Sequence, residues 1–396
     1  MNPSLNPFSP GAGTQPPELA GRDKLRETIR IAIERTRNIL PVKSFIMVGL
    51  RGVGKTVLLN RMRDDAEAAG ICCLRIEAQE NRSLPSMLVS QLRQALLKLS
   101  RKKQAGELAM QALRGLAGFI KALKVKYQDI DVALDFEPLL GVADNGNLGD
   151  DLQDLIELAG KAAASGGTAL AIFIDELQYV REDELAALIT ALHQAAQRRQ
   201  PVIMVGAGLP QLRARTGDAK SYAERLFDFP DIGPLTPDAA RTAIEKPLRD
   251  RNIEITPDAT ALIVENTSGY PYFIQEWGKQ VWDAAETPPI TRVDVEKATD
   301  LVTASLDESF FRVRFDRLTP TEKKYLRAMA QLGPGPFKSG EIAAAAGKRV
   351  SEVGTIREQL INKGMIWSPS HGETAFTVPL FDSFMRRIMP DGLDWK

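Results

Sequence analysis

Hydrophobic residues in the first 235 positions fall into two kinds of pattern. Short uninterrupted runs predict buried strands, and they lie at residues 44–48, 169–174 and 201–205. Residues 71–78 also predict a strand. Elsewhere apolar residues recur every three or four positions, as on the inner face of a helix. These stripes lie at about residues 21–38, from 55 onward, 84–99, 150–164 and 182–198. Alternating strands and helices favour an α/β fold with a mostly parallel sheet covered by helices on both faces.

Residues 101–149 interrupt this alternation. A helical stripe predicts one amphipathic helix, and its members are Leu113, Leu116, Ile120 and Leu123. We interpret the stripe as core packing. Residues 130–136 then alternate between apolar and polar side chains, which predicts a half-buried strand. The segment is therefore interpreted as an inserted helix and strand.

After residue 235 the patterns predict helices more often than strands. Thr236, Thr256 and Thr319 each precede a proline, an arrangement typical of a helix start, and Glu322 completes a capping box with Thr319. Three helices at 320–332, 340–346 and 351–363 are followed by two short strands at 365–367 and 374–376. The predicted domains are an extended proline-rich segment (1–17), an α/β core (18–235), a helical region (236–305) and a C-terminal domain (306–396).

Composition narrows the class of protein further. Fifty-one basic residues balance fifty-one acidic ones, which argues against a basic nucleic-acid coat protein. Two adjacent cysteines, Cys72 and Cys73, and two histidines offer no zinc constellation. The longest apolar runs are too short to span a bilayer, and residues 1–17 carry five prolines and no charge, unlike a signal peptide. We expect a cytoplasmic protein without a membrane partner.

A phosphate-binding loop is the strongest chemical signal. The sequence GLRGVGKT fits G-x-x-x-x-G-K-[ST] and stands between a predicted strand and a predicted helix. Its glycines let successive backbone N–H groups face an anion at a helix N-terminus. Lys55 is expected to reach the β- and γ-phosphates of ATP, and Thr56 to ligate Mg²⁺. The predicted nucleotide-binding residues here are Gly49, Leu50, Arg51, Gly52, Val53, Gly54, Lys55, Thr56 and Val57.

Two acidic residues end the most hydrophobic predicted strand. Asp175 is placed to bind Mg²⁺, and Glu176 to orient and deprotonate an attacking water molecule. No Asn-Lys-x-Asp guanine signature occurs, so the chain is predicted to be an ATPase rather than a GTPase. A nucleotide-binding module without turnover is the alternative that Glu176 argues against.

Together these motifs resemble AAA+-type P-loop ATPases over residues 16–390, and more closely the branch of origin-recognition and STAND ATPases. Ala20–Asp23 is similar to the "GR-acid" segment of that branch, which implies that Gly21 and Arg22 lie near the adenine. Gly269-Tyr270-Pro271 is similar to its G-x-P motif, which implies a place for Pro271 near the base. Asp175–Gln178 resembles its D-E-x-Q variant. The resemblance implies ATP between the α/β core and a helical lid.

The same resemblance implies an arginine that acts in a neighbouring subunit of a homo-oligomer. Arg225 is our candidate, and Arg213 and Arg215 are its competitors. A surface arginine paired locally with Glu224 or Asp228 is the equally weighted alternative. The strand at 201–205 also departs from the family, because the glycines and alanine that follow it replace a polar residue.

The C-terminal pattern of three helices and a hairpin resembles a winged helix. Its third helix would expose Arg349, Arg357 and Lys363, which are our candidate DNA contacts, together with Glu352 and Glu358. Eleven basic against eight acidic residues between 319 and 396 is a weak excess for tight DNA binding. We therefore keep two hypotheses open. One is an ATP-hydrolysing switch acting on double-stranded DNA, and the other is a signalling or phage-defence ATPase whose winged helix binds a protein.

Overall fold

The computed structural model describes residues 1–11, 13–130 and 136–391, and this part of the chain divides into two compact units. One, here called the sheet unit, consists of residues 22–49 and 55–232. The other, here called the helical unit, consists of residues 1–21, 50–54 and those from 233 onward. The predicted boundaries at 235 and 305 stay predictions.

The sheet unit is built on five parallel strands, in the order β2-β3-β4-β1-β5. The strands are β1 (Ser44–Val48), β2 (Cys72–Glu77), β3 (Leu170–Asp175), β4 (Val202–Gly208) and β5 (Phe227–Asp228). All residues of β1 and β3 are buried, which agrees with their uninterrupted hydrophobic runs. The parallel sheet is therefore confirmed, although β4 is longer than predicted and the two-residue β5 was not predicted.

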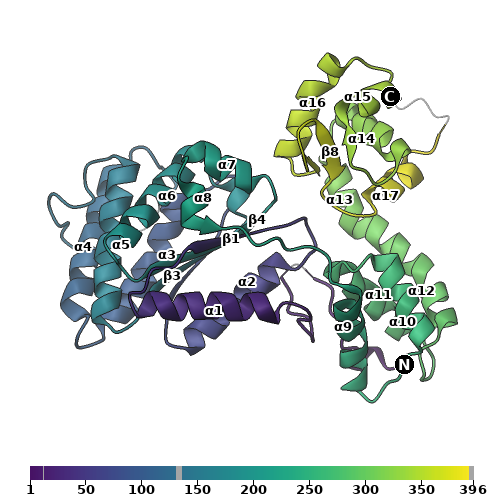
Figure 1. Ribbon diagram of the computed structural model, residues 1–396, viewed down its shortest axis with the longest axis horizontal. Helices are drawn as coiled ribbons and strands as arrows, with labels where there is room; N and C mark the ends of the chain where they lie inside the picture. Colours follow the sequence, from purple (N-terminus) through teal and green to yellow (C-terminus); the bar gives the residue numbers. More distant parts are fainter. Residues whose placement is uncertain (12, 131–135, 392–396) are drawn as a thin grey trace. The chain divides into compact units, whose positions relative to one another are not determined.

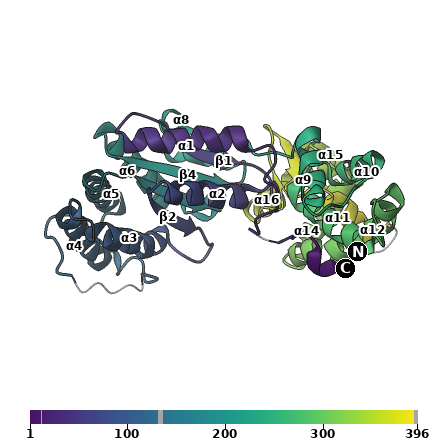
Figure 2. The ribbon, with the colours of Figure 1, turned by 90° about the horizontal axis from the view of Figure 1, so that it is seen from below.

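Helices cover both faces of this sheet (Figure 1). One face carries α1 (Asp23–Arg37) and α2 (Lys55–Ala68), and the other carries α3 (Leu84–Ser100), α5 (Leu148–Ser165) and α6 (Glu182–Gln197). The inserted helix α4 (Gly106–Leu123) packs against α3 and α5 (Figure 2). Short helices η2 (Leu177–Tyr179), α7 (Leu212–Ala219) and α8 (Ala223–Leu226) follow strands β3 and β4.

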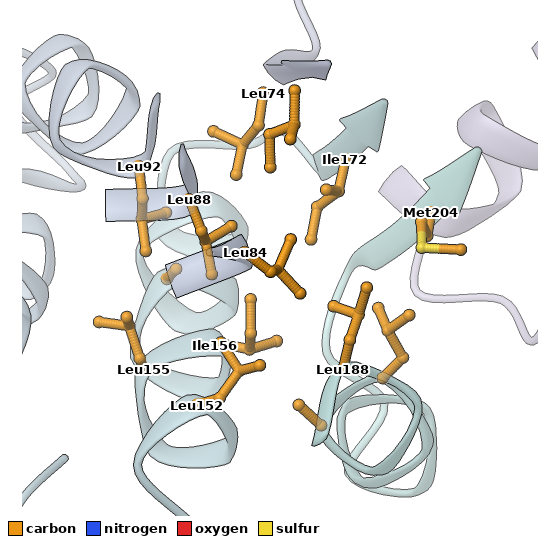
Figure 3. Close-up of a cluster of buried hydrophobic side chains, with 14 of the residues drawn as sticks. Leu74, Leu84, Leu88, Leu92, Leu152, Leu155, Ile156, Ile172, Leu188 and Met204 are labelled. Carbon is orange, nitrogen blue, oxygen red and sulfur yellow. The ribbon is translucent and has the colours of Figure 1, made fainter. Parts of the chain in front are cut away.

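Aliphatic side chains fill the space between the sheet and its α3–α5–α6 face (Figure 3). Leu84 and Leu88 of α3, Ile156 of α5 and Leu188 of α6 meet Ile172 of β3 in this layer. The leucine stripe of α4 extends the same buried cluster, so its interpretation as core packing is confirmed. The strand predicted at 130–136 falls largely on residues 131–135, outside the described part of the chain.

From residue 233 onward, the helical unit contains four consecutive helices, followed by a small domain of helices and short strands. The helices are α9 (Pro237–Arg249), α10 (Pro257–Thr267), α11 (Pro271–Ala284), α12 (Arg292–Ser305), the π-helix η3 (Leu306–Phe311), α13 (Arg312–Phe315), α14 (Pro320–Leu332), α15 (Ser339–Ala345), α16 (Val350–Asn362) and α17 (Phe381–Ile388). Strands β6 (Phe337–Lys338), β7 (Ile366–Trp367) and β8 (Glu373–Phe376) form an antiparallel sheet in the order β6-β8-β7. The predicted cap at Thr236 and the capping box at Thr319 are both present, whereas Thr256 is the N-cap of α10 but its side chain makes no capping hydrogen bond.

One continuous hydrophobic cluster runs through the whole helical unit. The rings of Phe273 in α11 and Phe311 in η3 lie 6.4 Å apart, and Phe311 stacks on Phe384 of α17 at 5.2 Å. Helices on both sides of residue 305 therefore share one aromatic core.

The N-terminal segment, which includes the 3₁₀ helix η1 (Pro3–Leu5), also joins this core. Phe8 is buried, and its ring lies where a side chain on Gly278 would stand. Trp282 donates a hydrogen bond from its indole N–H to the carbonyl of Asn2 (2.9 Å). The predicted extended segment is thus anchored along α11.

Candidate membrane spans are absent from the described residues, since none of their helices combines the necessary length with sufficient apolarity.

Candidate functional site

The phosphate-binding loop leads from β1 directly into α2, as the motif requires. Gly52 and Gly54 adopt φ angles of 82° and 87°, a left-handed region that other residues enter only with strain. At the start of the loop, the N–H of Gly49 donates to the carbonyl of Gly208 at the end of β4 (3.2 Å). The predicted strand–loop–helix context is confirmed.

Lys55 is the first residue of α2 and is only 7% exposed. Its ammonium group donates a hydrogen bond to the carbonyl of Gly49, 3.0 Å away. A buried lysine at a helix N-terminus, beside a glycine loop, is suited to an anionic ligand, because both the ammonium charge and the helix dipole favour negative charge there.

Thr56 and Asp175 meet at the carboxyl ends of the strands. Asp175 is the last residue of β3, is 7% exposed and lines one small cavity together with Thr56. Burial raises the pKa of the Asp175 carboxyl, and its interaction with the Thr56 side chain opposes this change. The negative charge of Glu176 raises the same pKa further, whereas the charge of Lys55 lowers it. The structure therefore brings Lys55, Thr56 and Asp175 into one electrostatic environment.

Glu176 immediately follows β3 in a left-handed conformation (φ 50°, ψ 38°). Its N–H donates to Oδ1 of Asp175 (2.8 Å), and its carboxylate accepts a hydrogen bond from the side-chain amide of Gln178. Left-handed backbone at a residue other than glycine is uncommon and costs energy, which makes it a frequent mark of functional positions. Sequence reasoning noted Gln178 as part of a motif but missed its contact with Glu176.

The other predicted nucleotide-binding residues lie at the ends of helices or in the loop. Arg22 is the N-cap of α1, and burial lowers the pKa of its guanidinium. Gly21 has a φ of 70°, and Pro271 is the first residue of α11. Gly21 and Pro271 belong to the helical unit, so their place around a nucleotide stays a prediction. Val57 is half-buried on α2.

The three candidate arginines differ in what they bind. Arg213 contacts Asp231 (2.7 Å) and the carbonyl of Phe229 (2.8 Å). Arg215 donates to the carbonyls of Gln178 and Val180, which ties it to the turn after β3.

Arg225, on α8, is exposed, and within the described chain it makes no ion pair with Glu224 or Asp228. Asp228 instead pairs with Lys43 at 3.2 Å. The local pairing that we considered for Arg225 is therefore not formed.

Two of the three candidate DNA contacts hold the C-terminal domain together. Arg357 donates to Thr374 Oγ1 (2.7 Å), Ser368 Oγ and the carbonyl of Glu373 (both 2.9 Å). Lys363 forms an ion pair with Glu322 (2.8 Å). Arg349 is largely exposed and lies 3.0 Å from Glu352. Contact with DNA stays a prediction for all three residues, but Lys363 and Arg349 already form ion pairs and the guanidinium of Arg357 already donates to neutral oxygens of the hairpin.

Comparisons with known proteins bear on both halves of the chain. Residues 18–205 match the family described as "AAA ATPase domain". Residues 308–385 match a family described as a domain of unknown function, DUF8462. A search of curated protein sequences gave no significant match.

Among solved structures, the Walker-type ATPase PABY2304 of Pyrococcus abyssi is similar to this chain. It is 15% identical with a TM-score of 0.59, and the alignment covers 96% of this chain and 99% of the other. The ORC1 protein of Aeropyrum pernix, solved in complex with DNA, is 14% identical, with coverage of 94% of each chain and a TM-score of 0.48. The RuvB Holliday junction branch migration motor of Thermotoga maritima is 15% identical, with coverage of 92% and 96% and a TM-score of 0.45.

The family match and the fold lead to the same conclusion. Residues 18–205 match the AAA ATPase domain family, and the five-stranded parallel sheet with its flanking helices has the P-loop AAA+ fold, which supports a nucleotide-dependent ATPase. The finer resemblance to a STAND branch and to a winged helix stays a prediction.

Proposed function

We propose that this protein binds ATP with Mg²⁺ at the phosphate-binding loop, hydrolyses it, and uses the helical unit to convey the nucleotide state to a partner. The observation that carries the proposal is that Thr56 and the buried Asp175 line one small cavity, next to the buried Lys55. A hydroxyl, a carboxylate and an ammonium group in this arrangement match the needs of a metal-bound triphosphate.

The donor set suits Mg²⁺. Thr56 and Asp175 offer a hydroxyl and a carboxylate oxygen, which are hard ligands of the kind that Mg²⁺ prefers. Burial disfavours the ionised form of Asp175, and a bound cation would remove that cost. When bound, Mg²⁺ would neutralise charge on the β- and γ-phosphates. Lys55 and the N–H groups of the loop would bind the phosphate oxygens.

Glu176 is proposed as the general base. Its carboxylate would accept a proton from the attacking water, whose oxygen forms a bond to the γ-phosphorus while the bond to the β–γ bridging oxygen breaks. The products are ADP and inorganic phosphate. The support for this role is the position of Glu176 directly after the Asp175 that ends β3.

The test compares single variants in ATP binding and in steady-state hydrolysis. Glu176→Gln should bind ATP as the wild type does and lose about 10²–10⁴-fold in kcat. Lys55→Ala should weaken ATP binding itself. Glu182→Gln, at an exposed glutamate in the first turn of α6, is the matched control and should behave as wild type. Wild-type turnover in Glu176→Gln would overturn the assignment of the base.

The nucleotide state is proposed to reach the C-terminal domain through the helical unit. The shared aromatic core of α11, η3 and α17 supports this step, because tightly packed elements transmit displacement instead of absorbing it. In this proposal residues 236–305 act as the lid, and residues 306–396 act as a winged helix that carries the output.

Double-stranded DNA and a protein are the two candidate partners for that output. The ion pairs of Lys363 with Glu322 and of Arg349 with Glu352 favour the protein, because charges already paired neutralise fewer phosphates. Binding of a DNA duplex, measured at several salt concentrations, distinguishes the two. A steep fall of affinity with salt would support the DNA version, whereas no binding at low salt would leave the signalling version.

A further inference from the structure

Gln178 connects the proposed general base to the neighbouring strand. Its side chain is 9% exposed and lies in η2, the turn that follows β3. The amide nitrogen donates a hydrogen bond to the carboxylate of Glu176. The amide oxygen accepts a hydrogen bond from the N–H of Leu209, just beyond β4 (3.1 Å). Both ends of this amide are therefore used.

The end of β4 leaves room for the amide because residue 208 is a glycine. A Cβ atom on Gly208 would lie 2.5 Å from Oε1 of Gln178 and 2.4 Å from Leu212. Any side chain at position 208 would therefore displace both the Gln178 amide and the Leu212 side chain. The small residue at the end of β4 and the long polar residue of η2 are complementary in size.

The backbone of the turn is held independently of this amide. Arg215 in α7 donates to the carbonyl of Gln178 and to that of Val180 (2.9 Å). With its backbone held by Arg215 and its amide held by Leu209, Gln178 has little freedom to rotate. Its donor is thus presented to Glu176 in a fixed direction, and Glu176 itself has the strained backbone described above.

We infer that Gln178 is the positioning residue for Glu176, fixing the orientation of its carboxylate for proton transfer from water. This inference rests on the proposed role of Glu176. A general base gives its full effect only within hydrogen-bonding reach of the proton it accepts. An unrestrained glutamate side chain would spend much of its time in other rotamers, so the effect of losing Gln178 should fall on kcat rather than on ATP binding.

Three variants test the inference through steady-state kinetics, ATP binding and thermal melting. Gln178→Ala removes the amide, and Gly208→Ala displaces it without touching it chemically. Both should lower kcat at least about 10-fold while leaving the ATP dissociation constant within about threefold of wild type. Retained ATP binding also shows that each variant is folded.

Gln178→Glu separates positioning from a structural role. It keeps the size of the side chain and the acceptor for Leu209, but it removes the amide N–H that donates to Glu176. If Gln178 positions Glu176, kcat should fall at least about 10-fold in this variant too, while ATP binding and the melting temperature stay close to wild type. If Gln178 has only a structural role, Gln178→Glu should keep the wild-type kcat. Gln197→Glu, at an exposed position near the end of α6, is the control and should leave kcat unchanged.

The possible outcomes are distinct. If kcat is unchanged in Gln178→Ala, or in Gln178→Glu, while Glu176→Gln is inactive, the inference about Gln178 fails and the proposed function stands. If Glu176→Gln hydrolyses ATP normally, the proposed base itself is wrong.

Discussion

The ammonium group of Lys363, at the end of α16, lies 2.8 Å from Oε2 of Glu322, in the first turn of α14. Glu322 is 2% exposed and also accepts a hydrogen bond from the N–H of Thr319 (2.7 Å). Burial acts to raise the pKa of Glu322, but the hydrogen bonds from Lys363 and Thr319 outweigh it and hold the pKa below its usual range. The pair thus joins two helices of the C-terminal domain.

Replacing Lys363 with methionine should destabilise the domain by about 1–2 kcal/mol. This cost is smaller than that of breaking a fully buried ion pair, because Lys363 is partly exposed. A glutamate with a lowered pKa contributes stability above its ordinary pKa and loses it as pH falls through the lowered value. The difference between wild type and Lys363→Met should therefore be largest near neutral pH and shrink at acidic pH. Thermal melting at several pH values measures it. A constant difference at all pH values would contradict the pairing.

Asp175→Asn should make the nucleotide-free protein more stable at neutral pH. The raised pKa of Asp175 means that its contribution to stability is complete only when the carboxyl is protonated, and it is lost as pH rises through that pKa. Asparagine removes the cost of the buried charge, and a gain of about 1 kcal/mol would raise Tm by about 2–4 °C. MgATP should then stabilise the wild type but not the variant. A lower Tm of Asp175→Asn at pH 7 would contradict this account.

Arg225→Ala tests whether one subunit completes the site of another. Arg225 is exposed on α8 and lacks an ion pair among the described residues. If it acts in a neighbouring subunit, the wild-type ATPase rate per subunit should rise with protein concentration, and the variant should lose 10-fold or more in kcat. Arg213→Ala is the control, because Arg213 is bound to Asp231 and Phe229. A rate independent of both concentration and Arg225 would indicate a monomeric switch.

Phe8→Ala should destabilise the helical unit, since Phe8 anchors the N-terminal segment on α11. Truncating a buried phenylalanine costs about 3 kcal/mol. Leu5→Ala, at an exposed position of the same segment, should change the melting temperature little. Equal melting temperatures for Phe8→Ala and wild type would show that the anchor contributes no stability.

Much of the fold could be predicted because local signals agree with the tertiary structure. The run at 44–48 matches β1, and Thr319 with Glu322 forms the predicted capping box. The two-residue strands β5 and β6 could not be predicted, since their pairing depends on partners distant in sequence. The aromatic contacts of Phe311 could not be predicted for a different reason. Phe311 lies in the π-helix η3, which departs from the 3.6-residue period of an α-helix.

For the candidate site, motif spacing predicted the phosphate-binding loop and the acidic residues after β3. It did not predict the hydrogen bonds that candidate residues make with segments distant in the sequence. The phosphate-binding loop and Asp175 come together as the spacing of strand and helix implies. Whether Arg357 faces solvent or its own hairpin depends on the register of β8, which residue types alone do not fix. The hydrogen bond that the N–H of Leu209 donates to Gln178 likewise depends on β4 extending to Gly208, three residues beyond its hydrophobic run.

The aromatic core that crosses residue 305 constrains how the chain can be divided. A fragment ending there would leave Phe273 without Phe311 and Phe384, and a fragment beginning there would leave the same two rings without α11. Each piece would present a large apolar surface to water and would be prone to aggregate. In a protease digest the region from 233 to 391 should therefore survive as one resistant fragment, and in calorimetry it should melt in a single step. The two consecutive domains that the sequence predicts, residues 236–305 and 306–396, would then fold and be degraded as one unit.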